Sequence, residues 1–120
     1  MDASLPILVV DDSHTVRLAI TKQLRSLGFA DIDTAQDGET AIKWLSKKRY
    51  GLVLSDWEMQ PMGGKEFLQA LRQESKVPVI LITATASRDT SRLAGANVYL
   101  AKPFNEADLD TAIKRALLLR

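Results

Sequence analysis

Short apolar runs alternate with helical patterns along the whole chain. The apolar runs end near residues 10, 54, 82 and 100, and the segments between them carry apolar side chains at helical spacing. This alternation is typical of an α/β fold with a mostly parallel sheet. The run at 77–82 is almost continuously apolar, which predicts a strand buried on both faces. We therefore expect five strand-helix units.

Local signals place the ends of several helices. Ser13 can cap a helix over 14–27 that ends at Gly28, and Asn105 can cap the final helix. The stretch 84–94 is polar and short of large apolar residues, so any helix within it is expected to be brief. The other predicted elements are a strand at 32–34, a helix after 37–38, a helix opened by 63–64 and a strand at 97–101.

Composition narrows the class of protein. With 120 residues and 46% hydrophobic content, the chain suits one domain spanning 1–120. The net charge is +1 without long runs of one sign, so no direct nucleic acid partner is expected, and the basic segment 47–49 is interpreted as a solvated helix end. The chain lacks cysteine, which excludes disulfides and thiolate chemistry. Its short, acidic start and lack of a long apolar run predict a cytoplasmic protein without membrane insertion.

Three carboxylates stand where apolar runs end. Asp11 and Asp12 follow the first run, and Asp56 follows the run that ends at residue 54. The carboxyl ends of parallel strands meet at one edge of a sheet, so the three side chains should converge. Two like charges about 4 Å apart repel by roughly 4 kcal/mol even at an effective dielectric of 20. The cluster therefore predicts a bound cation, and oxygen ligands favour Mg²⁺.

Two further polar residues are expected at the same edge. Thr83 and Lys102 each lie at or just past the end of a predicted strand. Phosphoryl transfer is well served by carboxylates that hold a metal ion, together with a hydroxyl group and a fixed ammonium group. A carboxylate can also accept a phosphoryl group, and Asp56 stands alone where the other two are paired.

Four short motifs occur in order at predicted strand ends, and together they resemble the receiver domain of two-component response regulators over essentially the whole chain. This resemblance implies a (βα)5 flavodoxin-like fold, with a five-stranded parallel sheet of order 2-1-3-4-5 and helices on both faces. The motifs are Asp11-Asp12-Ser13-x-x-x-Arg17, Asp56-x-x-Met59, Thr83-Ala84 and Tyr99-x-x-Lys102-Pro103-Phe104.

The resemblance implies a role for each matching residue. Asp56 would be the phosphoacceptor. Mg²⁺ would be held by Asp12 directly, by Asp11 mainly through metal-bound water, by Asp56 and by the backbone carbonyl of Glu58. Lys102 would pair with the phosphoryl group.

The resemblance further implies a switch and its partners. Thr83 would swing toward the phosphoryl group, and Tyr99 would turn into the space that Thr83 leaves. The Lys102-Pro103 bond is a plausible cis peptide. A sensor histidine kinase or phosphotransfer protein would donate the phosphoryl group, and a downstream protein partner of unknown identity would respond. The chain would be a signalling domain that assists its own phosphorylation and dephosphorylation, not an enzyme.

The chain departs from the family pattern in two loops. Gln60 follows Met59 where the family usually has proline, with Pro61 displaced by one residue. The segment between Thr83 and Gly95 looks shorter than usual by roughly one helical turn. Glu58 and Thr85 also occupy positions that influence acyl-phosphate hydrolysis in the family.

Two other functions share parts of the pattern. A small aspartate-nucleophile phosphohydrolase uses similar groups, but such enzymes typically place a second acid two residues after the nucleophile, where this chain has Ser13 after Asp11. The unusual Gln60 loop and the short fourth-helix segment would suit a receiver-fold interaction module that works without phosphorylation. The acidic triad and Lys102 argue against that alternative.

Overall fold

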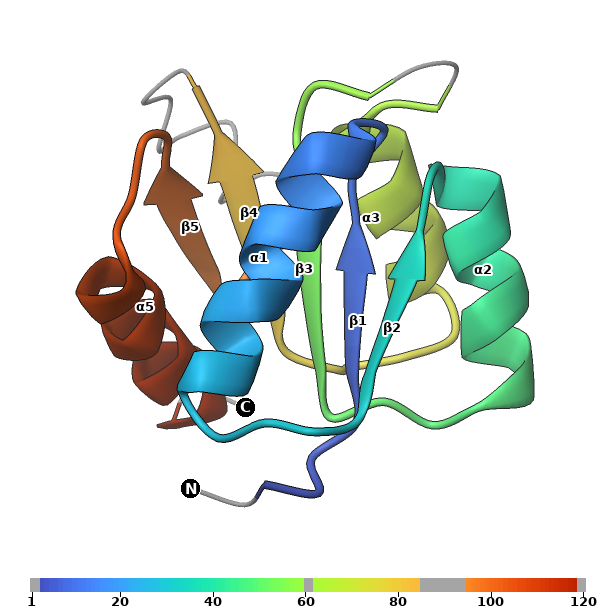
Figure 1. Cartoon of the computed structure of the whole chain (residues 1–120). Coiled ribbons are helices and arrows are strands. Elements are labelled where there is room, and N and C mark those ends of the chain that lie inside the picture. Colours follow the sequence, from blue (N-terminus) through green and yellow to red (C-terminus); the bar gives the residue numbers. More distant parts are fainter. Residues whose placement is uncertain (1–2, 60–61, 85–94, 119–120) are drawn as a thin grey trace.

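Five parallel strands form one sheet in the order β2-β1-β3-β4-β5 (Figure 1). The computed structural model describes residues 3–59, 62–84 and 95–118. The strands are β1 Ile7–Val10, β2 Ile32–Ala35, β3 Leu52–Asp56, β4 Val79–Thr83 and β5 Val98–Ala101. The helices of the described part are α1 His14–Ser26, α2 Gly38–Lys47, α3 Gly64–Arg72 and α5 Glu106–Leu118. The predicted strand order and fold class are confirmed.

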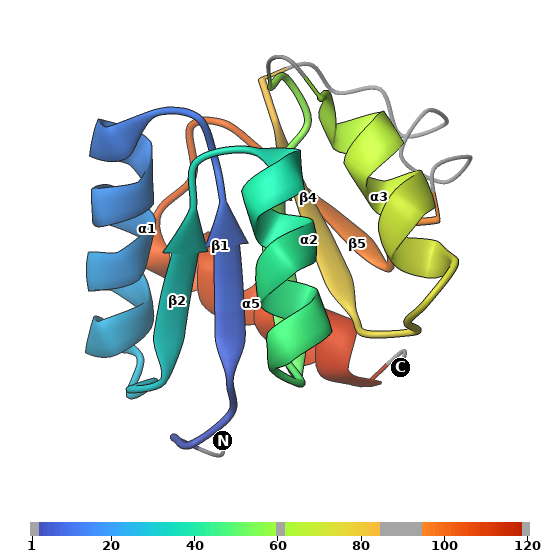
Figure 2. The same cartoon turned by 90° about the vertical axis from the view of Figure 1, so that its right-hand side faces the viewer.

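Two apolar layers hold the helices on the two faces of the sheet. α1 and α5 cover one face, and α2 and α3 cover the other (Figures 1 and 2). Side chains alternate between the layers along each strand, as the pleat requires. The first cluster includes Ile7, Val9, Ile20, Leu24, Leu54, Ile80, Leu109 and Ile113. The second cluster includes Leu8, Val10, Ala41, Val53, Phe67, Leu68, Val79 and Leu81.

The strand register brings the polar positions to one edge. Asp56 is paired with Ile82 across β3 and β4, and Thr83 is paired with Ala101 across β4 and β5. Lys102 is the next residue along the chain. β1 ends one residue before the acidic pair, so all of these positions lie at the carboxyl edge of the sheet.

Helix ends follow the predicted capping signals. The side chain of Ser13 accepts a hydrogen bond from the Val16 N–H, and Gly28 has a φ of 103° just after α1. A left-handed residue here lets the helix end in a Schellman motif, and glycine adopts it without strain. Asn105 and Asp108 exchange side-chain and backbone hydrogen bonds of 2.8 and 3.0 Å at the start of α5.

β4 begins at Val79, two residues later than the apolar run at 77–82 suggested, and it ends at Thr83 as predicted. Pro78 has no N–H to give to a ladder, although its carbonyl accepts a 2.9 Å hydrogen bond from the Val53 N–H. The Val77 N–H bonds to the Ser75 side chain. Thr83 is the last residue of β4, so the sheet holds its backbone in place.

The basic segment 47–49 is more than a solvated helix end. The ammonium of Lys48 lies 2.8 Å from a carboxylate oxygen of Asp31 and 2.9 Å from one of Asp33. The Tyr50 hydroxyl donates to the same Asp33 oxygen at 2.7 Å. Burial raises the pKa of Asp33, but the hydrogen bonds from Lys48 and Tyr50 lower it below its usual value. These contacts connect the end of α2 to β2.

Candidate functional site

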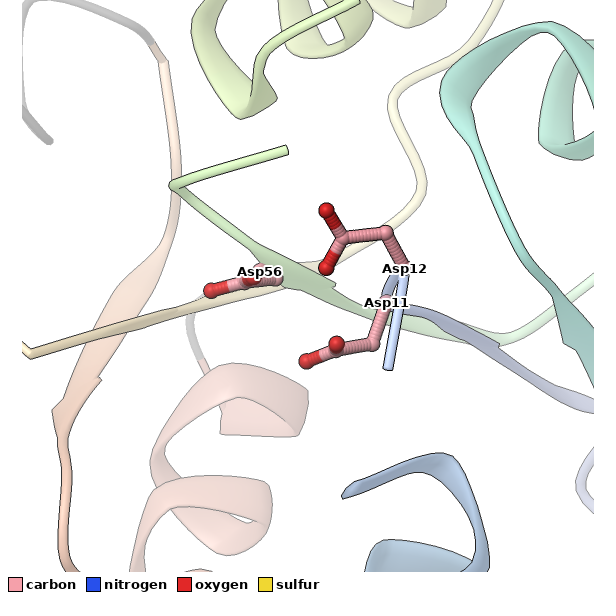
Figure 3. A group of neighbouring side chains, drawn as sticks. All are labelled: Asp11, Asp12 and Asp56. Atoms are coloured by element: carbon pink, nitrogen blue, oxygen red, sulfur yellow. The ribbon is translucent and has the colours of Figure 1, made fainter. Parts of the chain in front are cut away.

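Three carboxylates meet at the carboxyl edge of the sheet. Asp11, Asp12 and Asp56 each offer an oxygen such that the three atoms lie within 4.8 Å of one another. Figure 3 shows their side chains directed to the same side of the strand ends. Asp11 and Asp56 are buried, with 2% and 4% of their surface exposed, whereas Asp12 is exposed. The cluster therefore joins two buried carboxylates to one that faces solvent.

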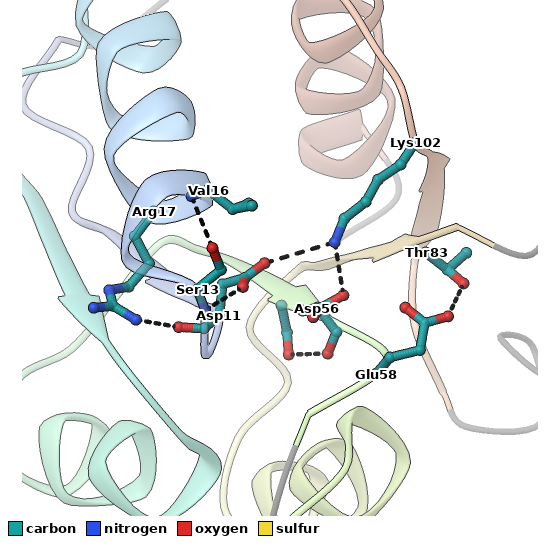
Figure 4. Close-up of polar contacts among 9 residues, drawn as sticks. Asp11, Ser13, Val16, Arg17, Asp56, Glu58, Thr83 and Lys102 are labelled. Atoms are coloured by element: carbon teal, nitrogen blue, oxygen red, sulfur yellow. Dashed lines mark hydrogen bonds and ion pairs between the residues drawn. The ribbon is translucent and has the colours of Figure 1, made fainter.

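The turn between β1 and α1 holds Asp11 through short-range contacts (Figure 4). One Asp11 carboxylate oxygen accepts a 2.8 Å hydrogen bond from the Ser13 N–H. The Arg17 guanidinium donates to the Asp11 backbone carbonyl at 2.6 Å. Arg17 belongs to the first sequence motif, but no role for its side chain was predicted. Its contact fixes the backbone that carries the acidic pair.

Lys102 reaches two of the three carboxylates. Its Nζ lies 3.1 Å from Oδ1 of Asp56 and 3.8 Å from Oδ2 of Asp11 (Figure 4). The Lys102 N–H donates to the Thr83 carbonyl at 2.8 Å, which anchors the residue beyond β5. The Lys102-Pro103 peptide is cis, as the sequence suggested. The ammonium therefore stands between two buried negative charges.

Burial and mutual repulsion shift the pKa values of the buried acids. Burial and the charge of Asp11 raise the pKa of Asp56 to about 6, even though Lys102 partly offsets both effects. Burial also raises the pKa of Asp11, against the lowering effect of the Ser13 N–H and Lys102. The protein alone thus stabilises these two negative charges incompletely.

The donor set fits a hard divalent cation. Within the described residues, the buried Oδ2 of Asp11 accepts no hydrogen bond, and its nearest cation is Lys102 at 3.8 Å. Buried carboxylate oxygens without donors are costly unless a proton or cation reaches them. Asp12 and Asp56 add oxygens from two sides. Asp11, Asp12 and Asp56 therefore suit an oxygen-ligated ion such as Mg²⁺.

A side-chain hydrogen bond links Thr83 to Glu58. The Thr83 hydroxyl donates to Oε1 of Glu58 at 2.8 Å (Figure 4). Thr83 is buried and Glu58 is exposed. The sequence predicted a metal-ligand role for the Glu58 backbone carbonyl and missed this contact of its side chain. The register of β3 and β4 brings the two residues to the same edge of the sheet, but the contact itself depends on side-chain rotamers that the sequence does not reveal.

The start of α3 packs directly on the strand end that carries Asp56. The Gly64 N–H donates to the Trp57 carbonyl at 2.9 Å. A Cβ at Gly64 would lie 2.5 Å from the Asp56 carbonyl oxygen and 2.7 Å from the Trp57 Cα, which are backbone atoms that cannot easily move. Glycine at this position is therefore required for the close approach of α3.

Tyr99 and the two unusual loops were also predicted to matter, and they lie apart from the acidic cluster or outside the described residues. Tyr99 lies on β5, is half-buried and packs against the second apolar cluster. Its switching role stays a prediction. The expectations about the Gln60-Pro61 loop, about Thr85 and about a short fourth helix fall on residues 60–61 and 85–94, outside the described residues.

The family model of the response regulator receiver domain matches residues 7–114. This chain belongs to the response-regulator receiver family. It is 37% identical over 115 residues to chemotaxis protein CheY-3 of Vibrio cholerae, a match that covers 91% of this chain and 88% of the relative. Receiver domains of this family generally act in signalling, so the chain is assigned to two-component signal transduction.

Solved structures agree with the family assignment. The Vibrio cholerae chemotaxis protein CheY4 superposes with a TM-score of 0.89 at 32% identity, covering 96% of this chain and all (100%) of the other. The Thermotoga maritima response regulator TrrA, solved in complex with Mg²⁺ and BeF, gives a TM-score of 0.84 at 36% identity, covering 94% and 99%. In the part of this chain that the structure describes, no helix is long and apolar enough to span a membrane.

Proposed function

We propose that this receiver domain accepts a phosphoryl group on Asp56 from a histidine kinase or phosphotransfer protein and thereby changes its affinity for a protein partner. The supporting observation is the placement of the buried Asp56 between the Lys102 ammonium, 3.1 Å away, and the acidic pair. One edge of the sheet then holds a nucleophile, a metal-binding set of carboxylates, and an ammonium that can neutralise the charge of the transferred phosphoryl group. The proposal keeps the cytoplasmic location that the sequence predicts.

In the proposed reaction, a carboxylate oxygen of Asp56 attacks the phosphorus of the donor. A P–O bond forms on Asp56 as the P–N bond to the donor histidine breaks, and the imidazole leaves with the bonding electron pair and takes up a proton. Bound Mg²⁺, held by Asp11, Asp12, Asp56 and the Glu58 carbonyl, would supply charge neutralisation of the phosphoryl oxygens. Lys102 neutralises the same developing charge from the β5 side.

The product carries a charge of about −1.5 to −2 where the free protein has one carboxylate. This change is the driving force for the switch. The Thr83 hydroxyl lies at the end of the adjacent strand β4 and is the natural donor to one phosphoryl oxygen. Tyr99, three residues before Lys102 on the next strand, is proposed to transmit the change to a partner surface.

The proposal is tested by the intact mass of the protein after incubation with a small acyl-phosphate donor. We expect a gain of one phosphoryl group that requires Mg²⁺ and is absent from Asp56→Asn. Undiminished labelling of Asp56→Asn would show that Asp56 is not the acceptor. No gain by the unmodified chain under any condition would favour the phosphorylation-independent interaction module.

Magnesium binding gives a separate prediction. Trp57 adjoins Asp56 and packs against the second apolar cluster, so its fluorescence should report on the site, whereas Trp44 is 37% exposed on α2. In a Trp44→Phe background, we expect Asp12→Asn to weaken Mg²⁺ binding by about tenfold or more, since a carboxylate ligand is lost. Asp110→Asn on α5, where the carboxylate pairs with Lys114, is the control and should leave the affinity unchanged. Equal affinities for Asp12→Asn and the parent would contradict the ligand assignment.

A further inference from the structure

The hydroxyl of Thr83 has a single proton, and in this structure that proton is given to Glu58. The acceptor oxygen of Glu58 lies 2.8 Å from Thr83 Oγ1. The side chain of Thr83 is buried, so it has little freedom to turn away from this edge of the sheet. A hydroxyl can donate only one hydrogen bond. Thr83 therefore cannot donate to Glu58 and to a phosphoryl group on Asp56 at the same time.

The acceptor of this hydrogen bond is also a charged group beside the reacting centre. Glu58 lies two residues after Asp56, just past the end of β3, and its side chain is exposed. A phosphoryl group on Asp56 would bring further negative charge toward the Glu58 carboxylate. An exposed side chain can turn into water at little cost, whereas the buried Thr83 remains at the site. The two acceptors thus compete for one donor, and Glu58 is the one that can leave.

We propose that Glu58 is a latch: its carboxylate holds the Thr83 hydroxyl in the unphosphorylated protein and opposes the switch until a phosphoryl group on Asp56 displaces it. This inference rests on the proposed function and adds a positioning residue that acts through Thr83. Removing the Glu58 carboxylate should make the phosphorylated arrangement easier to reach, because Thr83 no longer has a competing acceptor.

The test uses beryllofluoride with saturating Mg²⁺, whose fluorines stand in for the phosphoryl oxygens on Asp56. Affinity is followed by Trp57 fluorescence in a Trp44→Phe background. Glu58→Ala is expected to tighten beryllofluoride binding by about three- to tenfold, the size of one charge-assisted hydrogen bond to an exposed partner. Glu39→Ala is the matched control, since this exposed glutamate lies in the first turn of α2. It should have no effect.

A second background separates the latch from simple charge repulsion. If Glu58 acts through Thr83, Glu58→Ala should have almost no effect in a Thr83→Ala chain and its full effect in a Thr83→Ser chain, which keeps the hydroxyl. Equal tightening in the Thr83→Ala and unmodified chains would mean that Glu58 acts by charge alone and would overturn the latch. Absence of tightening in every background would overturn it as well.

The same titration distinguishes failure of the latch from failure of the proposed function. Mg²⁺-dependent binding by the unmodified chain that is lost in Asp56→Asn supports the phosphoacceptor role, whatever Glu58 does. If the unmodified chain fails to bind beryllofluoride, both the acceptor role and the latch are overturned. Binding without coupling between Glu58 and Thr83 overturns the latch only.

Discussion

Replacing Asp56 by asparagine is expected to stabilise the metal-free protein by about 2–3 kcal/mol at pH 7. Burial, together with the charge of Asp11, raises the pKa of this carboxyl from its ordinary 3.8 to about 6. At pH 7 the folded protein must therefore carry a carboxylate that the unfolded chain holds at less cost. Asparagine keeps the shape and can still accept a hydrogen bond from Lys102, but it has no charge to bury.

The sign of the pH dependence follows from the same shift. Between pH 4 and about 6, the folded protein holds a proton on Asp56 that the unfolded chain has lost, so the free energy of unfolding falls as the pH rises through this window. Above about pH 6 the contribution stays constant. The advantage of Asp56→Asn should therefore grow from pH 4.5 to about 6.5 and then level off.

Urea unfolding of both chains at several pH values, with a chelator present, checks this prediction. Asp110→Asn serves as a control for loss of a carboxylate that is paired with Lys114 on the surface of α5. Addition of Mg²⁺ should stabilise the parent more than Asp56→Asn, because the ion neutralises the charge that burial disfavours. An Asp56→Asn variant that is no more stable than the parent at pH 7 would contradict the electrostatic account of the site.

The features predicted correctly from the sequence depend on local patterns. Apolar runs gave the strands, and Ser13, Gly28 and Asn105 marked helix ends that the structure shows at or within one residue of the expected positions. The approach of Asp11 and Asp56 could also be anticipated, because parallel strands in one sheet align their carboxyl ends. Such inferences need only periodicity and topology.

Contacts between side chains on different elements could not be predicted in this way. The ion pairs of Lys48 with Asp31 and Asp33 join the residue just after α2 to the region of β2, and no local pattern pairs them. The hydrogen bond from Thr83 to Glu58 depends on the rotamers of two side chains at neighbouring strand ends. Periodicity indicates which face or edge a residue occupies, whereas rotamers and loop conformations decide which atoms touch.

Lys102→Met should have the largest effect on phosphorylation after loss of Asp56 itself. The Lys102 ammonium lies 3.1 Å from Asp56 and 3.8 Å from Asp11. Loss of one preorganised charge-stabilising group typically lowers a rate by about 10²- to 10³-fold, and we expect a decrease of that size. Methionine keeps most of the length and apolar stem of the side chain, which is itself 28% exposed.

The rate of phosphoryl gain is measured by intact mass with a small acyl-phosphate donor at saturating Mg²⁺. Lys114→Met is the matched control, because Lys114 also pairs with an aspartate but lies on the surface of α5. Its rate should equal that of the parent. Lys102→Arg retains the charge with a planar group of different shape, so it should restore only part of the rate. A Lys102→Met rate close to that of the parent would exclude Lys102 from the reaction.

Two effects could slow the Lys102→Met variant, and pH separates them. Lys102 lowers the pKa of Asp56, so its loss leaves more of the carboxyl protonated and unable to attack phosphorus. That effect should disappear when the pH is raised from 7 to about 8.5, well above the value of about 6 for Asp56 in the parent. Loss of the ammonium as a partner of the phosphoryl oxygens does not depend on the protonation of Asp56. If Lys102 neutralises the phosphoryl oxygens as proposed, most of the decrease should persist at the higher pH.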